Sequence, residues 1–221
     1  MLKEYSVNSI LFDMDGVITN TMPDHFKAWK ITLRAIGVNV THLDIYAREG
    51  QRGMNSIREL LQSKKIQFTD RQLLDILSAK EAIFKKIVSV RYIPGARTLL
   101  KSCHKKGLQL GLVTGTSYPE TKKILPDKYF DLFSCVITGD IVKLGKPNPE
   151  PYLLALKMLQ VSAKDTIVIE NAPLGIRSAK QAGIRCFALE TSLPMKYLKE
   201  ADMIFKSFKE FNQNVHLKKL P

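Results

Sequence analysis

Carboxylate, hydroxyl, ammonium and amide side chains occur in four short clusters that could together perform phosphoryl transfer. The clusters are Asp13-Met14-Asp15-Gly16, Thr114-Gly115-Thr116, Gly145-Lys146-Pro147 and Glu170-Asn171. Each of them alone is typical of a surface turn, a loop or a helix cap. Together they are informative, because phosphoryl transfer needs an in-line nucleophile, positioning groups and cations that neutralise the transferring oxygens.

The first two clusters supply groups that could react with a phosphate or bind it. Asp13 can act as a covalent carboxylate nucleophile. Asp15 can protonate the leaving oxygen and later deprotonate the acceptor. Thr114 can donate its hydroxyl to a phosphate oxygen, and the amides of Gly115 and Thr116 are further donors at the start of a predicted helix.

The last two clusters supply positive charge and ligands for a cation. Lys146 can neutralise both the nucleophile and the phosphoryl group. Glu170 and Asn171 complete a set of oxygen ligands, and no cluster of His or Cys accompanies them. This favours Mg²⁺ over zinc as the cofactor. The predicted metal ligands are Asp13, Asp15, Glu170 and Asn171.

Alternating elements are expected to bring these clusters together. The chain alternates short apolar runs with amphipathic helical stretches, which predicts an α/β fold: a Rossmann-like, doubly wound, mostly parallel sheet with helices on both faces. Ligands bind beyond the carboxyl ends of the strands in such sheets, and the four clusters lie there. The expected strands are 9–12, 108–113, 135–137, 166–169, 186–189 and 203–205, and the expected helices are 96–106, 118–125, 149–159, 174–182 and 195–200.

The interval between the first two strands has the pattern of helices throughout. Helices are expected at 23–36, 55–61 and 71–88, joined by a polar segment with Gly50 and Gly53. This predicts an all-helical cap domain, residues 19–91, inserted into a catalytic core of residues 1–18 and 92–221. The turn signature Tyr92-Ile93-Pro94-Gly95 marks the return to the core, and the tail after Phe211 is expected to be peripheral.

The charge of the chain bears on its partners. Lys and Arg number 34 against 21 Asp and Glu, so the formal net charge is +13, and nucleic acid, an acidic partner or an anionic small substrate must be considered. The lysines form scattered pairs, and no basic run is interleaved with aromatic residues. Solvated helix faces and an anionic small-molecule substrate are therefore expected, without nucleic acid as a partner.

Other features bear on the setting of the protein. No run approaches the roughly 18 apolar residues of a membrane-spanning helix, and no signal-like segment precedes Asp13. The three cysteines are widely spaced and lack a C-x-x-C pattern, which favours reduced packing residues. We expect a cytoplasmic monomer without membrane contact.

The segments FDMDGVITNT, LGLVTGTS, GKPNPEPY and VIENAPLGIRSAKQAG carry a family resemblance. In their order and spacing, the chain resembles the haloacid dehalogenase superfamily of phosphatases and phosphomutases over nearly its whole length. The resemblance implies that Asp13 is phosphorylated and that Asp15 is the acid/base and a magnesium ligand through its backbone carbonyl. It also implies that Thr114 and Lys146 hold the phosphoryl group and that Asn171 occupies a metal-ligand position.

The helical insertion looks like the cap of the subgroup that contains β-phosphoglucomutase and related sugar-phosphate phosphatases. The segment that begins at Asn20 is similar to the part of that mutase that controls the acid/base aspartate, and this implicates Thr21 and His25. Lys80 matches a substrate-facing lysine of the family. With Gly16 and the phosphate-binding pair, the predicted substrate-binding residues are Gly16, Thr21, His25, Arg52, Lys80, Gly115 and Thr116.

Two positions depart from the subgroup pattern. Asn171 stands where the subgroup often has aspartate, and its amide oxygen can ligate magnesium but supplies no charge. The arginine that grips the distal phosphate in the mutase aligns with Gly53, next to Arg52. We therefore expect a phosphatase that acts on a small phosphorylated metabolite, a sugar phosphate in class, with water as the final acceptor.

Three alternatives stay open. A phosphomutase shares the aspartyl-phosphate intermediate and differs only in the second acceptor. A basic binding protein on an inactive enzyme fold would have no need of both Asp13 and Asp15. A dehalogenase acting on carbon would need no magnesium, and the predicted metal ligands Glu170 and Asn171 therefore argue against this alternative.

Overall fold

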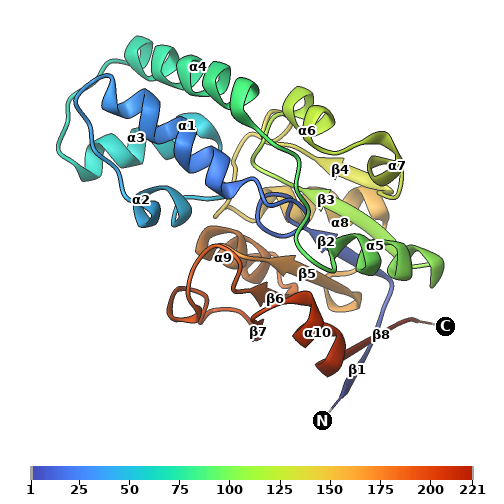
Figure 1. Ribbon diagram of the computed structural model, residues 1–221. Helices are drawn as coiled ribbons and strands as arrows, with labels where there is room; N and C mark the ends of the chain where they lie inside the picture. Colours follow the sequence, from blue (N-terminus) through green and yellow to red (C-terminus); the bar gives the residue numbers. More distant parts are fainter. Residues whose placement is uncertain (1, 221) are drawn as a thin grey trace.

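Six parallel strands form the central sheet in a computed structural model of the chain, which describes residues 2–220 (Figure 1). The order of the strands is β4-β3-β2-β5-β6-β7, so the chain winds outward from β2 first to one edge and then to the other. This is the doubly wound parallel sheet that the sequence predicts. The strands are β2 (Ser9–Phe12), β3 (Gln109–Val113), β4 (Cys135–Ile137), β5 (Thr166–Glu170), β6 (Arg185–Leu189) and β7 (Met203–Phe205).

Helices cover both faces of this sheet, so its inner strands are apolar on both sides. In β2, Ile10 and Phe12 pack into one hydrophobic cluster and Leu11 into the other. The first cluster includes residues of α5 (Ala96–Lys105), α6 (Tyr118–Ile124), α7 (Asp127–Phe130) and α10 (Phe208–Asn214). The second includes residues of α8 (Glu150–Leu159) and α9 (Pro173–Gln181).

Four further helices form the insertion between β2 and α5 and gather beside one end of the sheet (Figure 1). They have a hydrophobic cluster of their own, with Trp29, Leu33, Ile57 and Leu73 among its buried members. Capping boxes begin two of them. The hydroxyls of Thr41 and Thr69 each accept the backbone N–H of the residue three positions on, and their own amides donate to the side chain of that residue. The helices are α1 (Met22–Arg34), α2 (His42–Tyr46), α3 (Gly53–Ser63) and α4 (Asp70–Ile87).

The two segments that join the insertion to the sheet run side by side. The amide of Asn20 donates to the carbonyl of Arg91 at 2.7 Å, and the amide of Ile93 donates to that of Ile18 at 3.0 Å. Arg91 also forms an ion pair with Asp24 at 2.8 Å. These contacts lie where the sequence predicts the boundaries 18/19 and 91/92, and the division into core and cap stays a prediction.

The ends of the described chain form a second sheet that the sequence did not predict. The strands β1 (Lys3–Val7) and β8 (Val215–Lys219) pair in parallel. The expectation of a peripheral tail after Phe211 was wrong, because Val215 and Leu217 are buried in the hydrophobic core. Residues 195–200 form no α-helix but a single 3₁₀ turn (Met195–Tyr197), introduced by the extended backbone of Pro194.

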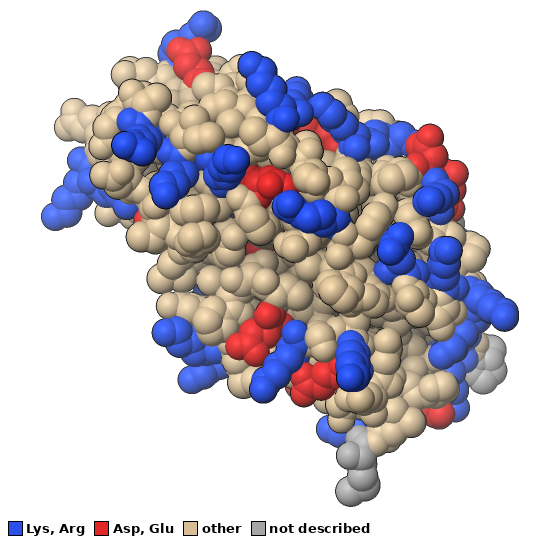
Figure 2. All heavy atoms as spheres, in the orientation of Figure 1, with Lys and Arg blue, Asp and Glu red and all other residues tan. Residues whose placement is uncertain are grey.

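Two expectations about composition can be compared with the structure. Cys103, Cys135 and Cys186 are free and buried, as predicted. Figure 2 shows Lys and Arg side chains scattered over the visible face and not gathered in one patch. Within residues 2–220, no helix combines the length and the apolar composition needed to cross a membrane.

Candidate active site

The predicted site residues converge at the carboxyl ends of the central strands. Asp13 directly follows β2, Thr114 directly follows β3, and Glu170 is the last residue of β5. The backbone continues the sheet pattern there, because the amide of Asp13 donates to Ile169 at 3.0 Å. Lys146 reaches the same place from the loop between β4 and α8.

Lys146 is fully buried between two carboxylates. Its ammonium donates to Asp13 Oδ1 at 2.6 Å, to Glu170 Oε1 at 2.7 Å and to the carbonyl of Val113 at 3.0 Å. Burial disfavours the charged form, but Asp13 and Glu170 outweigh it and raise the pKa of Lys146 above its usual value. Tyr152 donates its hydroxyl to the same Glu170 oxygen at 2.9 Å.

Asp13 presents one oxygen to Lys146 and keeps the other available. Its Oδ2 is buried and has no hydrogen-bond partner among residues 2–220. Burial raises the pKa of Asp13, Lys146 opposes this effect, and the nearby charges of Glu170 and Asp15 add to it. A carboxylate with one fixed and one open oxygen is suited to attack a phosphorus atom in line.

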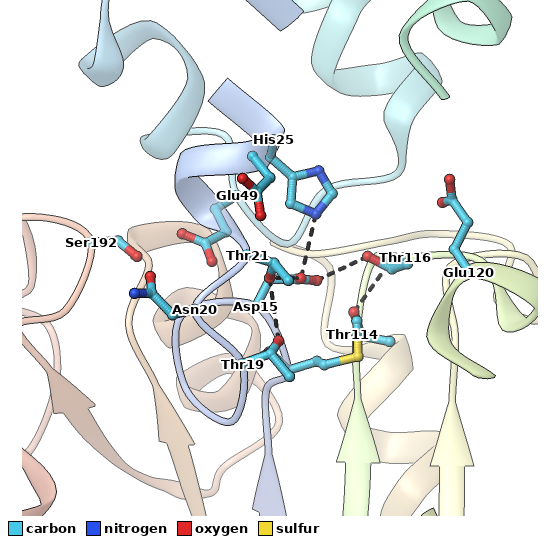
Figure 3. A network of polar contacts seen from close by, with 12 residues as sticks. Asp15, Thr19, Asn20, Thr21, His25, Glu49, Thr114, Thr116, Glu120 and Ser192 are labelled. Carbon is cyan, nitrogen blue, oxygen red and sulfur yellow. Dashed lines mark hydrogen bonds and ion pairs between the residues drawn. The ribbon is translucent and has the colours of Figure 1, made fainter. Parts of the chain in front are cut away.

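Asp15 lies in a network of donors on the side of the helical insertion (Figure 3). Its Oδ1 accepts from the hydroxyl of Thr21 and from His25 Nε2, the latter at 3.3 Å, and its Oδ2 accepts from Thr116 at 2.9 Å. Burial opposes ionisation, but His25 and the two hydroxyls outweigh it and lower the pKa of Asp15 to about 2. Thr114 accepts from the amide of Thr116, so its own hydroxyl hydrogen is free to donate.

His25 and Lys80 come from the helical insertion and share the ring of Phe84. The imidazole of His25 stacks on that ring with centroids 4.0 Å apart, and the Lys80 ammonium lies 4.7 Å from its centroid. Burial and the charge of Lys80 lower the pKa of His25. Burial also lowers the pKa of Lys80, which is only 6% exposed although its residue type is usually solvated.

A loop of the insertion between α2 and α3, residues 48–52, is seated on the core. A Cβ on Gly115 would lie 2.6 Å from the carbonyl oxygen of Gly50, and one on Gly50 would lie 2.8 Å from Lys146 Cδ. The guanidinium of Arg52 donates to the carbonyl of Lys143 at 2.8 Å. Glu49 accepts from the amide nitrogen of Asn171 at 3.0 Å.

A cavity of about 250 Å³ lies between this loop and the strand ends. Its wall combines apolar side chains such as Trp29 and Leu77 with charged ones such as Arg48 and Glu120. Gly16, Thr21, Lys146, Glu170 and Asn171 lie outside the lining. The predicted site residues that line the cavity are Asp13, Asp15, His25, Arg52, Lys80, Thr114, Gly115 and Thr116.

The donor set fits a magnesium ion. Asn171 donates from its amide nitrogen to Glu49 and to Ser192, and its Oδ1 is left buried without a partner among the described residues, like Asp13 Oδ2. Such oxygens suit Mg²⁺, which keeps several of its waters. Both oxygens of Glu170 accept hydrogen bonds from Lys146, Tyr152 or backbone amides. Within residues 2–220, no three His, Cys, Asp or Glu side chains form a metal-binding group by themselves.

Sequence reasoning missed three residues of this site. Ser192 follows β6 and was open to the same argument from strand ends that found Asp13. Glu49 precedes Gly50 in the loop, and a carboxylate beside a loop glycine was the available signal. Tyr152 lies in α8, where its aromatic side chain gives the ordinary pattern of a core residue.

Comparison with known proteins identifies the family of this chain. The family model described as haloacid dehalogenase-like hydrolase matches residues 10–189. The chain is 32% identical to a phosphorylated carbohydrates phosphatase of Thermotoga maritima, with 80% of this chain and 82% of the relative covered. It is 28% identical to the β-phosphoglucomutase of Bacillus subtilis, with 86% of each chain covered.

The solved structures agree with this result. A putative β-phosphoglucomutase from Bacteroides vulgatus superimposes with a TM-score of 0.84 at 32% identity and covers 96% of this chain and 88% of its own. The chain therefore belongs to the haloacid dehalogenase-like hydrolases, a family whose matched relatives include phosphatases and phosphomutases.

Proposed function

We propose that the enzyme is a magnesium-dependent phosphatase that hydrolyses a small phosphorylated metabolite, a sugar phosphate in class, through an aspartyl phosphate on Asp13. The observation that carries this proposal is the state of Asp13, with one oxygen held by Lys146 and the other buried and open beside the cavity. The names of the matched relatives, a phosphorylated carbohydrates phosphatase and a β-phosphoglucomutase, support the substrate class.

The reaction has two halves that Asp15 serves in opposite protonation states. In the first, Asp13 attacks phosphorus, the bond from phosphorus to the leaving oxygen breaks, and Asp15 gives that oxygen a proton. A phosphate dianion near Asp15 favours its protonated form, because like charges raise a carboxyl pKa. In the second, ionised Asp15 takes a proton from water, and the water oxygen attacks phosphorus. The bond from phosphorus to the Asp13 oxygen then breaks, which releases inorganic phosphate and regenerates Asp13.

Other groups bind and neutralise the phosphoryl oxygens. The hydroxyl of Thr114 is the proposed donor to them, and the charge of Lys146, whose three N–H groups donate to Asp13, Glu170 and Val113, is proposed to neutralise them. Asp13 and Asn171 are the proposed side-chain ligands of Mg²⁺, with the carbonyl of Asp15, and the ion supplies positive charge at the same oxygens. Glu170 is proposed to hold Lys146 in place, because both its oxygens are already hydrogen-bonded.

A phosphomutase is the second candidate, because cationic side chains line the cavity and could hold a second phosphate. Arg52 donates to the carbonyl of Lys143, and Arg48 donates to that of Asp44 at 2.7 Å. Each guanidinium is thus held by a backbone carbonyl but keeps further N–H groups, and Arg48 Nε has no partner among the described residues. The preference for hydrolysis rests instead on Gly53, which stands where the mutase has the arginine that grips the distal phosphate.

Product analysis separates the two candidates. β-Glucose 1-phosphate is incubated with enzyme and Mg²⁺, with and without a trace of the 1,6-bisphosphate, and inorganic phosphate and glucose 6-phosphate are followed together. Inorganic phosphate alone supports the phosphatase, and glucose 6-phosphate supports the mutase and overturns hydrolysis as the main reaction.

Asp13→Asn is the test of the covalent mechanism. The variant is expected to lose at least about a thousandfold in turnover, because the amide is a poor nucleophile. Asp131→Asn, the same change at an exposed position, is the control. Equal phosphate release by Asp13→Asn and the control would exclude the aspartyl phosphate.

A further inference from the structure

Asn171 is neutral at a position where a metal ligand is proposed, and its amide is held by a residue of the helical insertion. Its nitrogen donates to Glu49 Oε1 at 3.0 Å and to Ser192 Oγ at 2.7 Å. Both amide hydrogens are therefore used, and this fixes Oδ1 as the atom that is open to a cation. Glu49 and Asn171 are 122 positions apart in the sequence, so their contact depends on how the loop at residues 48–52 lies on the core.

Three oxygens around this contact lack partners within the described chain. They are Asp13 Oδ2, Asn171 Oδ1 and Glu49 Oε2. The residues that carry them are buried, with exposures of 2%, 0% and 8%. Lys146, the buried ammonium at the site, is already shared by Asp13 and Glu170. Buried carboxylates are costly without a partner, so this arrangement is suited to a divalent cation.

The loop that carries Glu49 is held against the core by backbone contacts on its other side. Gly115 has no Cβ, and this lets the carbonyl oxygens of Gly50 and Gln51 approach it. Gly145 gives the same room to the side chain of Arg52, which then donates to Lys143. Glu49 therefore contacts Asn171 only when this loop packs against the strand ends.

We propose that Glu49 is a positioning residue for the magnesium site: it orients the amide of Asn171 and supplies the negative charge that Asn171 lacks. Magnesium then binds at full affinity only with the loop seated. Because coupling between two equilibria is reciprocal, bound magnesium also stabilises the seated loop. The inference rests on the proposed magnesium-dependent function and adds a residue of the insertion to the site.

Calorimetric titration of the full chain with Mg²⁺ alone tests this role. Glu49→Gln keeps an oxygen that can accept from Asn171 but removes the charge, and we expect the Kd for Mg²⁺ to rise about tenfold, the lower range for residues that orient metal ligands. Glu81→Gln is the matched control, because Glu81 also belongs to the insertion and lines the cavity. Its Kd is expected to stay within about twofold of that of the parent.

A second substitution is expected to change the Kd for Mg²⁺ in the opposite direction. Asn171→Asp supplies the missing charge and is expected to lower the Kd for Mg²⁺ about tenfold. The side chain of an aspartate has no N–H that could donate to Glu49, and the two carboxylates repel each other. In the Asn171→Asp background, Glu49→Gln is therefore expected to leave the Kd unchanged or to lower it.

The outcomes distinguish the role of Glu49 from a general effect of charge. An unchanged Kd in Glu49→Gln, or the same tenfold rise in both backgrounds, overturns the proposal. Equal rises in Glu49→Gln and Glu81→Gln also overturn it. The titration contains no substrate, so these results are independent of the phosphate-release assay on Asp13→Asn. A failure of the proposed function is thereby distinguished from a failure of this inference.

Discussion

Lys146 stands between two buried carboxylates, and this arrangement explains how a single aspartate oxygen is left ready to react. Its ammonium takes Oδ1 of Asp13 and Oε1 of Glu170, at 2.6 and 2.7 Å. One positive charge cannot balance both carboxylates and the nearby Glu49. Burial and the neighbouring carboxylates accordingly raise the pKa of Asp13 and of Glu49, and the proposed Mg²⁺ would favour their ionised forms and the entry of a phosphate dianion.

The pKa of Asp15 leads to a prediction about stability at acid pH. Its folded value of about 2 lies below the ordinary 3.8, so the ionised form stabilises the folded state above pH 4. A difference of this size corresponds to about 2 kcal/mol, of which about half is lost by pH 3. Urea unfolding of the parent and of Asp15→Asn at pH 7, 4 and 3 measures it.

The sign of the effect decides the interpretation of that experiment. The difference in unfolding free energy between the parent and Asp15→Asn should be largest at pH 7 and should shrink as pH falls below 4. Asp131→Asn changes an exposed aspartate and provides the control. A difference that is constant from pH 7 to 3 would show that Asp15 does not titrate as described.

At the residue scale, the sequence predicts those site residues that lie at the ends of strands. Asp13, Thr114 and Glu170 follow or end buried strands, and parallel strands present these ends at one edge. Glu49 follows no strand. Its place beside Asn171 depends on the way a loop of the insertion lies on the core, which no local pattern encodes. Lys80 has the sequence pattern of an exposed helix residue, and tertiary packing buries it.

Among the elements, the loop at residues 48–52 packs directly against the residues that follow the strands. Gly115→Ala places a Cβ 2.6 Å from the carbonyl oxygen of Gly50 and 2.8 Å from that of Gln51. Real Cβ atoms do not come so near, and backbone atoms cannot move aside as a flexible side chain can. We expect the loop to be displaced, with a fall in kcat/KM of about a hundredfold through loss of positioning.

Two measurements separate this effect from a damaged core. The thermal midpoint of Gly115→Ala should stay close to that of the parent, because the displaced loop belongs to the insertion. Solution scattering should report a larger radius of gyration when the loop is no longer seated. Parental turnover in this variant would mean that catalysis does not need the loop at Gly115.

At the element scale, the sequence predicts what hydrophobic periodicity specifies. The six strands of the central sheet and the helices α1, α3 and α4 were expected close to their observed bounds, because their apolar residues recur at the period of the element. The short helices α2, α7 and α10 were missed, since about two turns or fewer give little periodic signal, whereas the equally short α6 was predicted as residues 118–125. The strand β8 alternates buried and exposed residues among lysines and histidine, so its composition resembled that of a polar tail.

For the whole molecule, the net charge is +13, and on the face that Figure 2 shows the Lys and Arg side chains are scattered. A net positive charge raises the local concentration of small anions, and the visible face has no continuous basic track for a polymer. The buried residues at the site have the opposite balance, with the acidic residues Asp13, Asp15, Glu49 and Glu170 against Lys80 and Lys146. In the proposed mechanism, the positive surface attracts an anionic substrate, and Mg²⁺ offsets the negative charge of the site where that substrate would bind.

The strands β1 and β8, near the two ends of the described chain, pair with each other, and this pairing gives a prediction about overall stability. Removal of residues 215–221 deletes β8, exposes the partner edge of β1 and takes Val215 and Leu217 out of the core. Two buried aliphatic side chains contribute roughly 3–6 kcal/mol, so the thermal midpoint should fall by about 10–20 °C. Because the strand lies at the opposite end of the sheet from the cavity, KM should not change.

Thermal unfolding and phosphate-release kinetics on the shortened chain measure these effects, and Lys218→Ser is the matched control. Lys218 is exposed and its ion pair with Glu4 lies at the surface, so that variant should keep a thermal midpoint close to that of the parent. A shortened chain that melts like the control would show that β8 adds nothing to the core. A shortened chain with a changed KM and an unchanged thermal midpoint would instead link the second sheet to the site. Loss of a purely structural strand should lower stability before it affects substrate binding.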